Sequence, residues 1–328
     1  MRYIIYGAGA VGGVIGTRLF QHGHDVTLIA RGAHLDAIRA GGLTLQTPDE
    51  TVVLPVPAVA HPSELSFTAD DVVLLTMKTQ HAEAALEDLR AVAGANIPVI
   101  CTQNGVENER LAARRFANVY AMLVLLPATY LEPGVVQAHC APVSGILDAG
   151  RYPSGDDALI ARITGDLDAS ELSAHPTPDI MRWKYAKLLS NLSNAIQAAC
   201  GFDGDARALY ARVRDEAIAC YRAAGIAWAS EAEMSERRKS MSPMREIAGH
   251  ARAGGSTWQS LARNTGSIET DYLNGEIALL GRLHGVPTPV NFVLQAIASR
   301  MARENMPPGS LRLVDGEEEI ARQTEGPP

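Results

Sequence analysis

The first half of the chain alternates short apolar, β-branched runs with stretches in which apolar positions recur at helical spacing. This alternation is typical of βαβ units, in which helices join parallel strands. The runs at 71–77 and 97–102 are largely apolar, as strands buried on both faces of a parallel sheet are. We therefore expect an α/β domain with a doubly wound parallel sheet, a helix at 10–22, and strands at 2–6, 25–30, 52–56, 71–77, 97–102 and 119–125.

After about residue 175 the pattern becomes helical throughout, which predicts a second, all-α domain. We expect helices at 179–199, 207–224, 256–263, 268–284 and 291–304. Two prolines in the sequence His175-Pro176-Thr177-Pro178 break any helix, so we place the boundary there, with domains at 1–176 and 177–308. The acidic, proline-ended segment 309–328 is weakly patterned, and we expect a mobile tail.

Composition narrows the partners of this 328-residue chain. A net charge of −8 provides no basic field for nucleic acid, and no apolar stretch reaches the roughly 20 residues that cross a bilayer. The four cysteines are irregularly spaced, which fits neither a disulfide framework nor a metal site. We expect a cytoplasmic protein with no metal, no nucleic-acid partner and no membrane segment.

A glycine-rich motif, GxGxxG, directly follows the first predicted strand and opens the first predicted helix. Its residues are Gly7, Ala8, Gly9, Ala10, Val11 and Gly12. In this context the first glycine permits a tight turn, the second lets a pyrophosphate approach the backbone, and the third lets the helix pack closely on the strand. The motif predicts a dinucleotide-binding, Rossmann-type domain, although a βα turn without a ligand has the same local pattern.

The end of the second strand indicates which dinucleotide is bound. An Asp or Glu there would hydrogen-bond the ribose 2′-hydroxyl of NAD, but the chain reads Ile29-Ala30-Arg31. A guanidinium binds a 2′-phosphate through charge-assisted hydrogen bonds, so Arg31 favours NADPH/NADP+. The missing acid also argues against a flavoprotein with the same glycine motif.

Two further loops follow strands on the edge where doubly wound sheets bind ligands. Lys78 follows the strand at 71–77 and is expected to contact the cofactor's phosphate or ribose. Asn104 follows the strand at 97–102 and is expected to orient nicotinamide or substrate. Each residue taken singly also fits an ordinary loop position.

In the second domain, Trp183, Lys187, Asn191 and Asn194 recur at steps of four, four and three. A continuous helix would display them along one face, which is costly to bury without a ligand or partners. A solvated stripe is the alternative. Lys184 lies one turn from Lys187 and also qualifies as a proton donor.

A second polar group of residues comprises Ser256 and the segment from Glu269 to Gly275. Glu269 precedes an apolar stripe, so the sequence alone makes it an acid favoured by the dipole of the following helix.

Taken together, these residues resemble the ketopantoate reductase (2-dehydropantoate 2-reductase) family, an NADPH-dependent family of pantothenate synthesis. The resemblance covers nearly the whole chain. Its motifs, in chain order, are GxGxxG, Arg31, Lys78, Asn104-Gly105, Lys187-Leu188-x-x-Asn191, Ser256 and Glu269-x-Asp271-Tyr272-x-Asn274-Gly275. It implies a Rossmann domain joined to a helical domain, with substrate in the cleft between them. The sequence leaves the oligomeric state open, and a homodimer through the helical domain is one alternative.

The resemblance also implies individual roles. Lys187 takes the position of the catalytic lysine, and Glu269 that of the acid that helps organise lysine and substrate. Asn191, Asn194 and Ser256 fall among substrate-binding positions, and Asn104 contacts both cofactor and substrate. We accordingly expect replacement of Lys187 to lower kcat by orders of magnitude while NADPH binding persists, and replacement of Lys184 to have a mild effect on turnover.

The chain departs from the family pattern at the positions that bind the substrate. The family's second asparagine lies four residues after the first, whereas this chain has Ala195 there and Asn194 one residue earlier. The following stretch, Ile196-Gln197-Ala198, also departs from the family pattern. We expect a reductase of a small 2-oxo acid, most simply 2-dehydropantoate. A different 2-oxo acid and a non-enzymatic NADP(H)-sensing role remain alternatives.

Overall fold

The computed structural model describes residues 1–201, 206–252, 254–264 and 266–325 of the chain. The chain forms two compact units. The first comprises Met1–Lys184 and Ser230–Arg252, and the second comprises Tyr185–Ala229 and Ala253–Pro328. The domain boundary expected at Pro176 remains a prediction.

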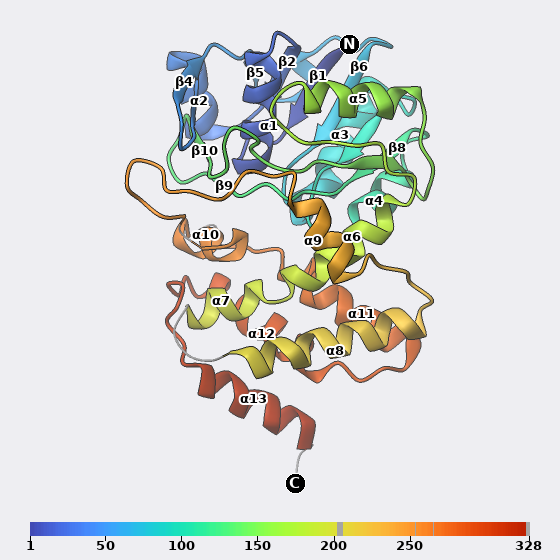
Figure 1. The fold of residues 1–328 in the computed structure, drawn as a ribbon, viewed down its shortest axis with the longest axis vertical. Helices are drawn as coiled ribbons and strands as arrows, with labels where there is room; N and C mark the ends of the chain where they lie inside the picture. Colours follow the sequence, from blue (N-terminus) through green and yellow to red (C-terminus); the bar gives the residue numbers. More distant parts are fainter. Residues whose placement is uncertain (202–205, 253, 265, 326–328) are drawn as a thin grey trace. The chain divides into compact units, whose positions relative to one another are not determined.

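The first unit contains a seven-stranded sheet in the order β11-β8-β7-β6-β1-β2-β5 (Figure 1). All its neighbouring strands run parallel except β11, which pairs antiparallel with β8. The strands are β1 (Arg2–Tyr6), β2 (Asp25–Ile29), β5 (Ala58–Val59), β6 (Asp71–Leu75), β7 (Val99–Cys101), β8 (Val119–Met122) and β11 (Ala149–Arg151). The doubly wound α/β class expected from the sequence is confirmed.

Both faces of this sheet are buried, which explains the continuous apolar runs. On β1, Ile5 packs into one hydrophobic core while its neighbour Ile4 packs into the other. On β6, Leu74 and Val73 divide in the same way. Successive side chains of a strand point to opposite faces, so a strand covered on both sides needs apolar residues at every position.

A second, four-stranded sheet in the order β4-β3-β10-β9 also belongs to the first unit. Its strands are β3 (Leu43–Gln46), β4 (Thr51–Leu54), β9 (Ala128–Thr129) and β10 (Val135–Ala138). The strand expected at 52–56 is therefore present as β4, but the prediction that it belongs to the parallel sheet is wrong. A tight turn, in which the Thr47 N–H donates to the Glu50 carbonyl at 2.8 Å, pairs β4 antiparallel with β3.

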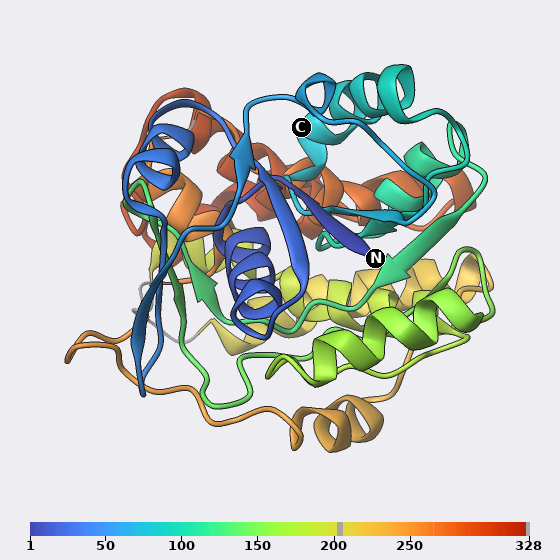
Figure 2. The ribbon, with the colours of Figure 1, turned by 90° about the horizontal axis from the view of Figure 1, so that it is seen from above.

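Helix α1 (Ala10–Gln21) lies between the two sheets (Figure 2). A Cβ at Gly16 would stand 2.6 Å from Leu28 Cδ2 of the large sheet, and one at Gly13 would stand 2.6 Å from Val136 Cγ1 of the small sheet. Glycine on two sides of one helix lets both sheets approach its backbone. The GxGxxG pattern predicts this packing role for Gly12 alone.

The first unit is completed by short helices around the sheets. They are α2 (Gly32–Gly41), α3 (Ala82–Ala93), α4 (Asn108–Ala113), α5 (Ala158–Asp168) and α9 (Glu231–Arg238), with 3₁₀ turns η1 (Pro62–Glu64) and η2 (Thr79–His81). Helix α9 belongs to the returning segment Ser230–Arg252. Its Arg237 forms a bidentate ion pair with the buried Asp148, at 2.6 and 2.7 Å, which fixes the segment to the first unit.

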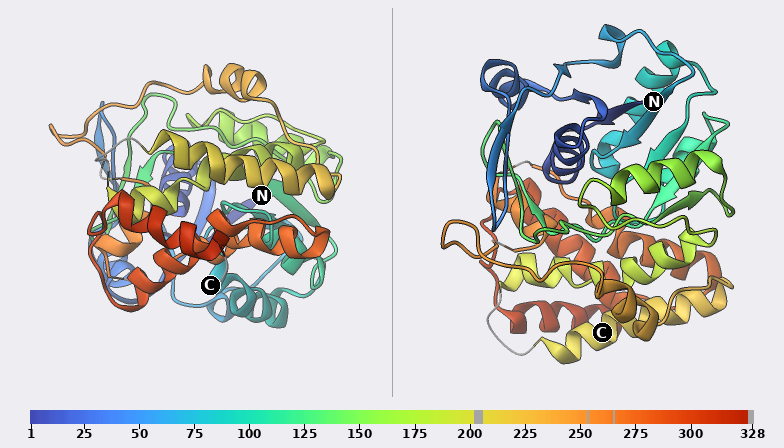
Figure 3. Two further views of the ribbon diagram at one scale, coloured as in Figure 1. Left: turned by 90° about the horizontal axis from the view of Figure 1, so that it is seen from below. Right: turned by 45° about the horizontal axis from the view of Figure 1, so that its top comes forward.

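The described part of the second unit is helical, as the sequence predicts, and its helices pack against one another (Figures 1 and 3). The chain enters it within α6 (Ile180–Asn191). The further elements are α7 (Asn194–Cys200), α8 (Arg207–Ala223), α10 (Ser256–Ala262), η3 (Thr270–Tyr272), α11 (Asn274–His284), α12 (Pro289–Arg303) and α13 (Leu313–Glu325). The single helices expected at 179–199 and 268–284 are each broken into two.

Residues 309–325 form ordered contacts with the rest of the second unit, while the mobility expected for 309–328 stays a prediction. Gly309 and Leu311 donate backbone hydrogen bonds to the carbonyls of Ala198 and Ala199, at 2.9 and 3.0 Å. Helix α13 then packs on α12 with Ile320 fully buried. The carbonyls at the end of α7 need hydrogen-bond donors, and the backbone N–H groups of the tail supply them. Residues 326–328 of the predicted tail lie outside the described residues.

The close packing of α1 gives a stability prediction. A methyl group at Gly12 would overlap the Gly7 carbonyl oxygen and the Thr76 hydroxyl, so Gly12→Ala should lower the free energy of unfolding by about 1–3 kcal/mol. Gly165, inside α5, has open space at its Cβ position, so Gly165→Ala should be neutral or stabilise by up to about 1 kcal/mol. Urea unfolding of both variants measures the contrast, and equal effects would contradict it.

Candidate functional site

The glycine loop after β1 has the form that a pyrophosphate requires. Gly7 adopts φ +110°, a conformation that favours glycine, where the chain turns from strand to helix. A Cβ at Gly9 would meet nothing within 4 Å, and no side chain caps the first turn of α1. The backbone at Gly9 is therefore accessible and the helix N-terminus is available for an anion. These features fit a bound dinucleotide.

A buried histidine that carries no sequence motif holds this loop in place through hydrogen bonds. His34 of α2 is buried, and its Nδ1 accepts a hydrogen bond from the Gly134 N–H at 2.9 Å. Nε2 must then carry the proton, which it donates to the Ala8 carbonyl at 2.6 Å. Burial lowers the pKa of His34, and the bond to Ala8 opposes that shift. A neutral imidazole thus ties the glycine loop to the chain before β10.

Basic side chains gather near the carboxyl ends of β2 and β6. Arg31 is exposed at the N-cap of α2, and Lys78 stands at the N-cap of η2. Both lie close enough to His81 to act on it: burial lowers the pKa of His81, and the charges of Arg31 and Lys78 lower it further. The cluster of Arg31, Lys78 and His81 suits a phosphate group.

The loop that carries Asn104 rests on a buried ion pair. Lys184 Nζ lies 2.5 Å from Glu109 Oε1 and donates to the Gln103 carbonyl at 3.0 Å. The two side chains are 3% and 0% exposed, and burial raises the pKa of Glu109 against the opposing effect of Lys184. Lys184 therefore fixes the backbone immediately before Asn104, so its replacement is expected to lower stability. The mild effect on turnover stays a prediction.

In the second unit, α6 carries Lys187 and Asn191 one turn apart, and α6 ends at Asn191. Asn191 is buried, and its Nδ2 has no hydrogen-bond acceptor among residues 1–201, 206–252, 254–264 and 266–325. An unsatisfied buried amide costs free energy. A ligand oxygen would satisfy this donor.

Helix α6 stops where it does because of a distant asparagine. Asn274 donates from Nδ2 to the Leu192 carbonyl at 3.1 Å and to Asn291 Oδ1 at 3.0 Å. Asn291 in turn donates to Glu216 at 2.8 Å, and the Glu216 carboxylate accepts the first backbone N–H groups of α12. The stripe of Trp183, Lys187, Asn191 and Asn194 is consequently not one continuous helix face.

Asn194 begins α7 and lies against the start of α10, the helix that Ser256 opens. Its Oδ1 is 3.4 Å from the position that a Cβ at Gly255 would take. Gln197 Oε1 accepts the Gly255 N–H at 2.8 Å. Asn194 and Ser256 are thus brought into one neighbourhood, although Asn194 has left the helix of Asn191.

Glu269 is buried and stands at the N-cap of η3 rather than within a helical first turn. The Tyr272 N–H donates to its carbonyl at 2.9 Å. Asp271 accepts a hydrogen bond from Gln295 at 2.9 Å, which joins η3 to α12. Within the motif from Glu269 to Gly275, Asp271 and Asn274 therefore have structural roles.

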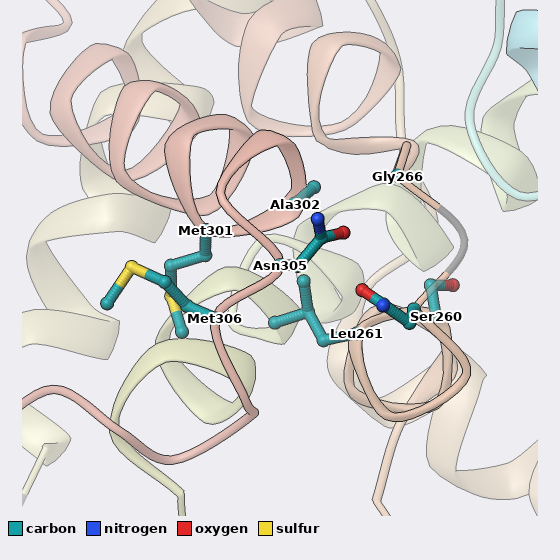
Figure 4. A pocket seen from close by; sticks show the side chains of 8 residues that line it. Ser260, Leu261, Gly266, Met301, Ala302, Asn305 and Met306 are labelled. Atoms are coloured by element: carbon teal, nitrogen blue, oxygen red, sulfur yellow. The ribbon is translucent and has the colours of Figure 1, made fainter.

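The second unit also contains a pocket, which provides no acidic or basic side chain for catalysis (Figure 4). None of its lining residues is charged. They are Ser260, Leu261, Asn264, Gly266, Met301, Ala302, Asn305 and Met306. Within the described parts of the chain, no three His, Cys, Asp or Glu side chains gather as a metal site would require, and no helix is long and apolar enough to span a membrane.

Comparison with known proteins gives matches over both units. A family model described as ketopantoate reductase PanE/ApbA matches residues 3–153, and its C-terminal counterpart matches residues 179–302. A 2-dehydropantoate 2-reductase of Mesorhizobium japonicum is 30% identical over 339 residues, covering 93% of this chain and 98% of that protein.

Solved structures also match over most of the chain. A PanE/ApbA family ketopantoate reductase from Ralstonia eutropha JMP134 has a TM-score of 0.76 at 29% identity, covering 93% of this chain and 99% of the other. D-mandelate dehydrogenase, solved with NADH and anilino(oxo)acetate, has a TM-score of 0.80 at 24% identity, covering 94% and 100%. The latter likeness is one of fold.

The buried ion pair predicts a large stability effect. Lys184→Met should leave Glu109 buried and unpaired, and lower the free energy of unfolding by about 3–5 kcal/mol. The double variant Lys184→Met/Glu109→Leu should recover most of that loss. Lys239→Met, at an exposed lysine, is the matched control and should change stability by less than about 0.5 kcal/mol. A Lys184→Met variant as stable as the control would refute the role, and urea unfolding decides.

His34 predicts a pH dependence. Above the unfolded-state pKa of about 6.5 the imidazole is neutral in both states. Below it the unfolded chain binds a proton that folded His34 resists, so stability is lost as pH falls from 6.5 toward the lowered folded pKa, by up to about 1.4 kcal/mol per pH unit. Glutamine can replace both hydrogen bonds without titrating, so His34→Gln should flatten this part of the curve. Urea unfolding from pH 7.5 to 5.5 tests this, and parallel curves would contradict it.

Proposed function

The chain belongs to the ketopantoate reductase PanE/ApbA family, and from that premise we propose that it reduces a small 2-oxo acid to the 2-hydroxy acid with NADPH. The first candidate substrate is 2-dehydropantoate. Family membership makes the chain an oxidoreductase, so the sensing role is set aside. The observation that carries the proposal is α6, which presents Lys187 one turn from the unsatisfied amide of Asn191.

The cofactor is assigned to the first unit. The loop from Gly7 to Gly12 and the N-terminus of α1 would hold the pyrophosphate, as the accessible backbone at Gly9 supports. Arg31 and Lys78 would hold the 2′-phosphate, which favours NADPH over NADH because no carboxylate follows β2 to accept a ribose hydroxyl. Asn104 would orient the nicotinamide. Bound NADPH supplies a hydride to the substrate's carbonyl carbon.

The proton is assigned to Lys187. As the carbonyl carbon gains a hydride, its oxygen develops negative charge and must take up a proton, and an ammonium group provides both charge and proton. Glu269 would keep Lys187 protonated and oriented. Asn191, Asn194 and Ser256 would fix the 2-oxo acid so that one face of the carbonyl is presented. The products are the 2-hydroxy acid and NADP+.

A 2-oxo acid other than 2-dehydropantoate is favoured by one observation, the break between α6 and α7. It removes Asn194 from the helix of Asn191, and Ala195 occupies the family's second asparagine position. An amide displaced in this way would alter the contacts to the substrate.

A substrate panel tests the proposal. Oxidation of NADPH and NADH is followed with 2-dehydropantoate and a series of 2-oxo acids of different side chains. We expect turnover with at least one of them and a preference for NADPH. Lys187→Met should lower kcat by about 10²- to 10⁴-fold while the Kd for NADPH, measured by fluorescence, stays within twofold. Lys239→Met is the control. Unchanged kcat in Lys187→Met would reassign the proton donor, and a panel without turnover would overturn the proposal.

A further inference from the structure

The hydrogen bonds of His34 belong to a longer series of contacts within the first unit. Gly134, the residue before β10, donates its N–H to His34 Nδ1 and accepts the Thr44 N–H of β3, at 2.9 Å in each case. The ring of Tyr130, which follows β9, packs on the imidazole with 4.5 Å between the ring centroids. The small sheet therefore sets the position of the imidazole, and the imidazole in turn holds the Ala8 carbonyl.

The contact between the small sheet and His34 depends on a glycine at position 134. Gly134 has φ +80°, and a Cβ there would stand 3.0 Å from the Cβ of Ala37, which lies one turn after His34 on α2. The backbone before β10 therefore lies directly against α2, which brings the Gly134 N–H within reach of the imidazole. A side chain at this position would strain the backbone and move that N–H away from Nδ1.

The peptide group between Ala8 and Gly9 is held at both ends. Its carbonyl accepts a hydrogen bond from His34 Nε2 at 2.6 Å, and its N–H donates to the Gly7 carbonyl at 2.8 Å. The carbonyl oxygen lies toward α1, 3.2 Å from the position that a Cβ at Gly13 would take. Because a peptide group is planar, fixing the carbonyl also fixes the direction of the backbone that enters the N-cap of α1. Ala8 is buried, so loss of His34 would leave its carbonyl without that donor in a place that excludes water.

We propose that His34 is a positioning residue for the cofactor: it holds the Ala8–Gly9 peptide with its carbonyl turned inward, and so keeps the glycine loop in the form that accepts a pyrophosphate. This inference deepens the cofactor assignment and rests on the proposed function. A peptide turned the other way would bring a carbonyl oxygen to the open side of Gly9, where its partial negative charge would repel a phosphate. The imidazole acts through the backbone and does not touch the dinucleotide.

Binding measurements with three ligands separate this role from a direct contact. NADPH and NADH share a pyrophosphate, whereas adenosine 2′-monophosphate carries the 2′-phosphate without one. His34→Leu removes both hydrogen bonds of the imidazole. It should raise the Kd of NADPH and of NADH by the same factor, at least fivefold, while the Kd of adenosine 2′-monophosphate stays within twofold. Arg31→Ala should give the reverse pattern, in which NADPH and adenosine 2′-monophosphate bind more weakly and the Kd of NADH stays within twofold.

Three further variants test whether the effect passes through these hydrogen bonds. His34→Gln can make both of them and should bind each dinucleotide within about twofold of wild type. His22→Leu is the matched control, because exposed His22 lies 2.9 Å from the Arg18 carbonyl at the opposite end of α1. Gly134→Ala should weaken both dinucleotides as His34→Leu does, even though it leaves the imidazole in place. The double variant should bind no more weakly than the weaker single variant, because both changes act through one contact.

The outcomes separate the possible roles of His34. Unchanged Kd values for NADPH and NADH in His34→Leu, together with a lowered Tm, would make the residue structural only and overturn the proposal. A loss confined to NADPH would indicate contact with the 2′-phosphate, and an equal loss for all three ligands would indicate general disruption, and either result overturns it. If wild type binds both dinucleotides but reduces no 2-oxo acid, the proposed function fails and the Kd comparison still decides the role of His34. If wild type binds neither dinucleotide, both proposals fail.

Discussion

The packing of α1 between two sheets is the constraint on which the first unit depends. Gly12 and Gly16 let the helix approach the large sheet, while Gly13 lets it approach Val136 of the small sheet. Larger side chains would separate these layers and move the helix N-terminus away from the end of β1. The same glycines that stabilise the fold therefore set the position of the backbone for which phosphate binding is proposed. His34 then holds that backbone through the Ala8 carbonyl.

The two units satisfy their buried polar groups by different means. The first relies on full charges in pairs, such as Lys184 with Glu109 and Arg237 with Asp148. The second relies on amides, with Asn274 and Asn291 linking Glu216 to the carbonyl that ends α6. Ion pairs and amide networks both specify one arrangement of the chain, since a partner left alone is costly. Loops that carry predicted site residues contact the ion pairs of the first unit and the amide network of the second.

Local patterns predicted most of the fold because they need no distant information. The turn at Gly7, the helix after it and the buried strand β6 follow from glycine positions and apolar runs of a few residues. The break after α6 was missed because its cause, Asn274, lies 82 residues away, and the return of α9 was missed because Arg237 meets Asp148 across 89 residues. The strand at Thr51–Leu54 was found, but its sheet depends on a hairpin turn and not on its own periodicity. Arg31 and Lys78 were predicted from their positions after strands, whereas His34 carries no local signature.

The return of Ser230–Arg252 to the first unit has a consequence for how the protein is made. A ribosome releases the chain from its N-terminus, and domains generally fold as they emerge. Here the sheets of the first unit are complete at Arg151, yet the guanidinium that neutralises buried Asp148 arrives only with residue 237. In the interval the ribosome delivers Tyr185–Ala229, a helical segment of the other unit that still lacks α10 to α13. Synthesis therefore passes through a stage at which both units are incomplete. A gene fragment that ends at the first crossing encodes no whole unit, because it lacks Ser230–Arg252, whereas a fragment that begins there encodes the second unit together with that segment of the first.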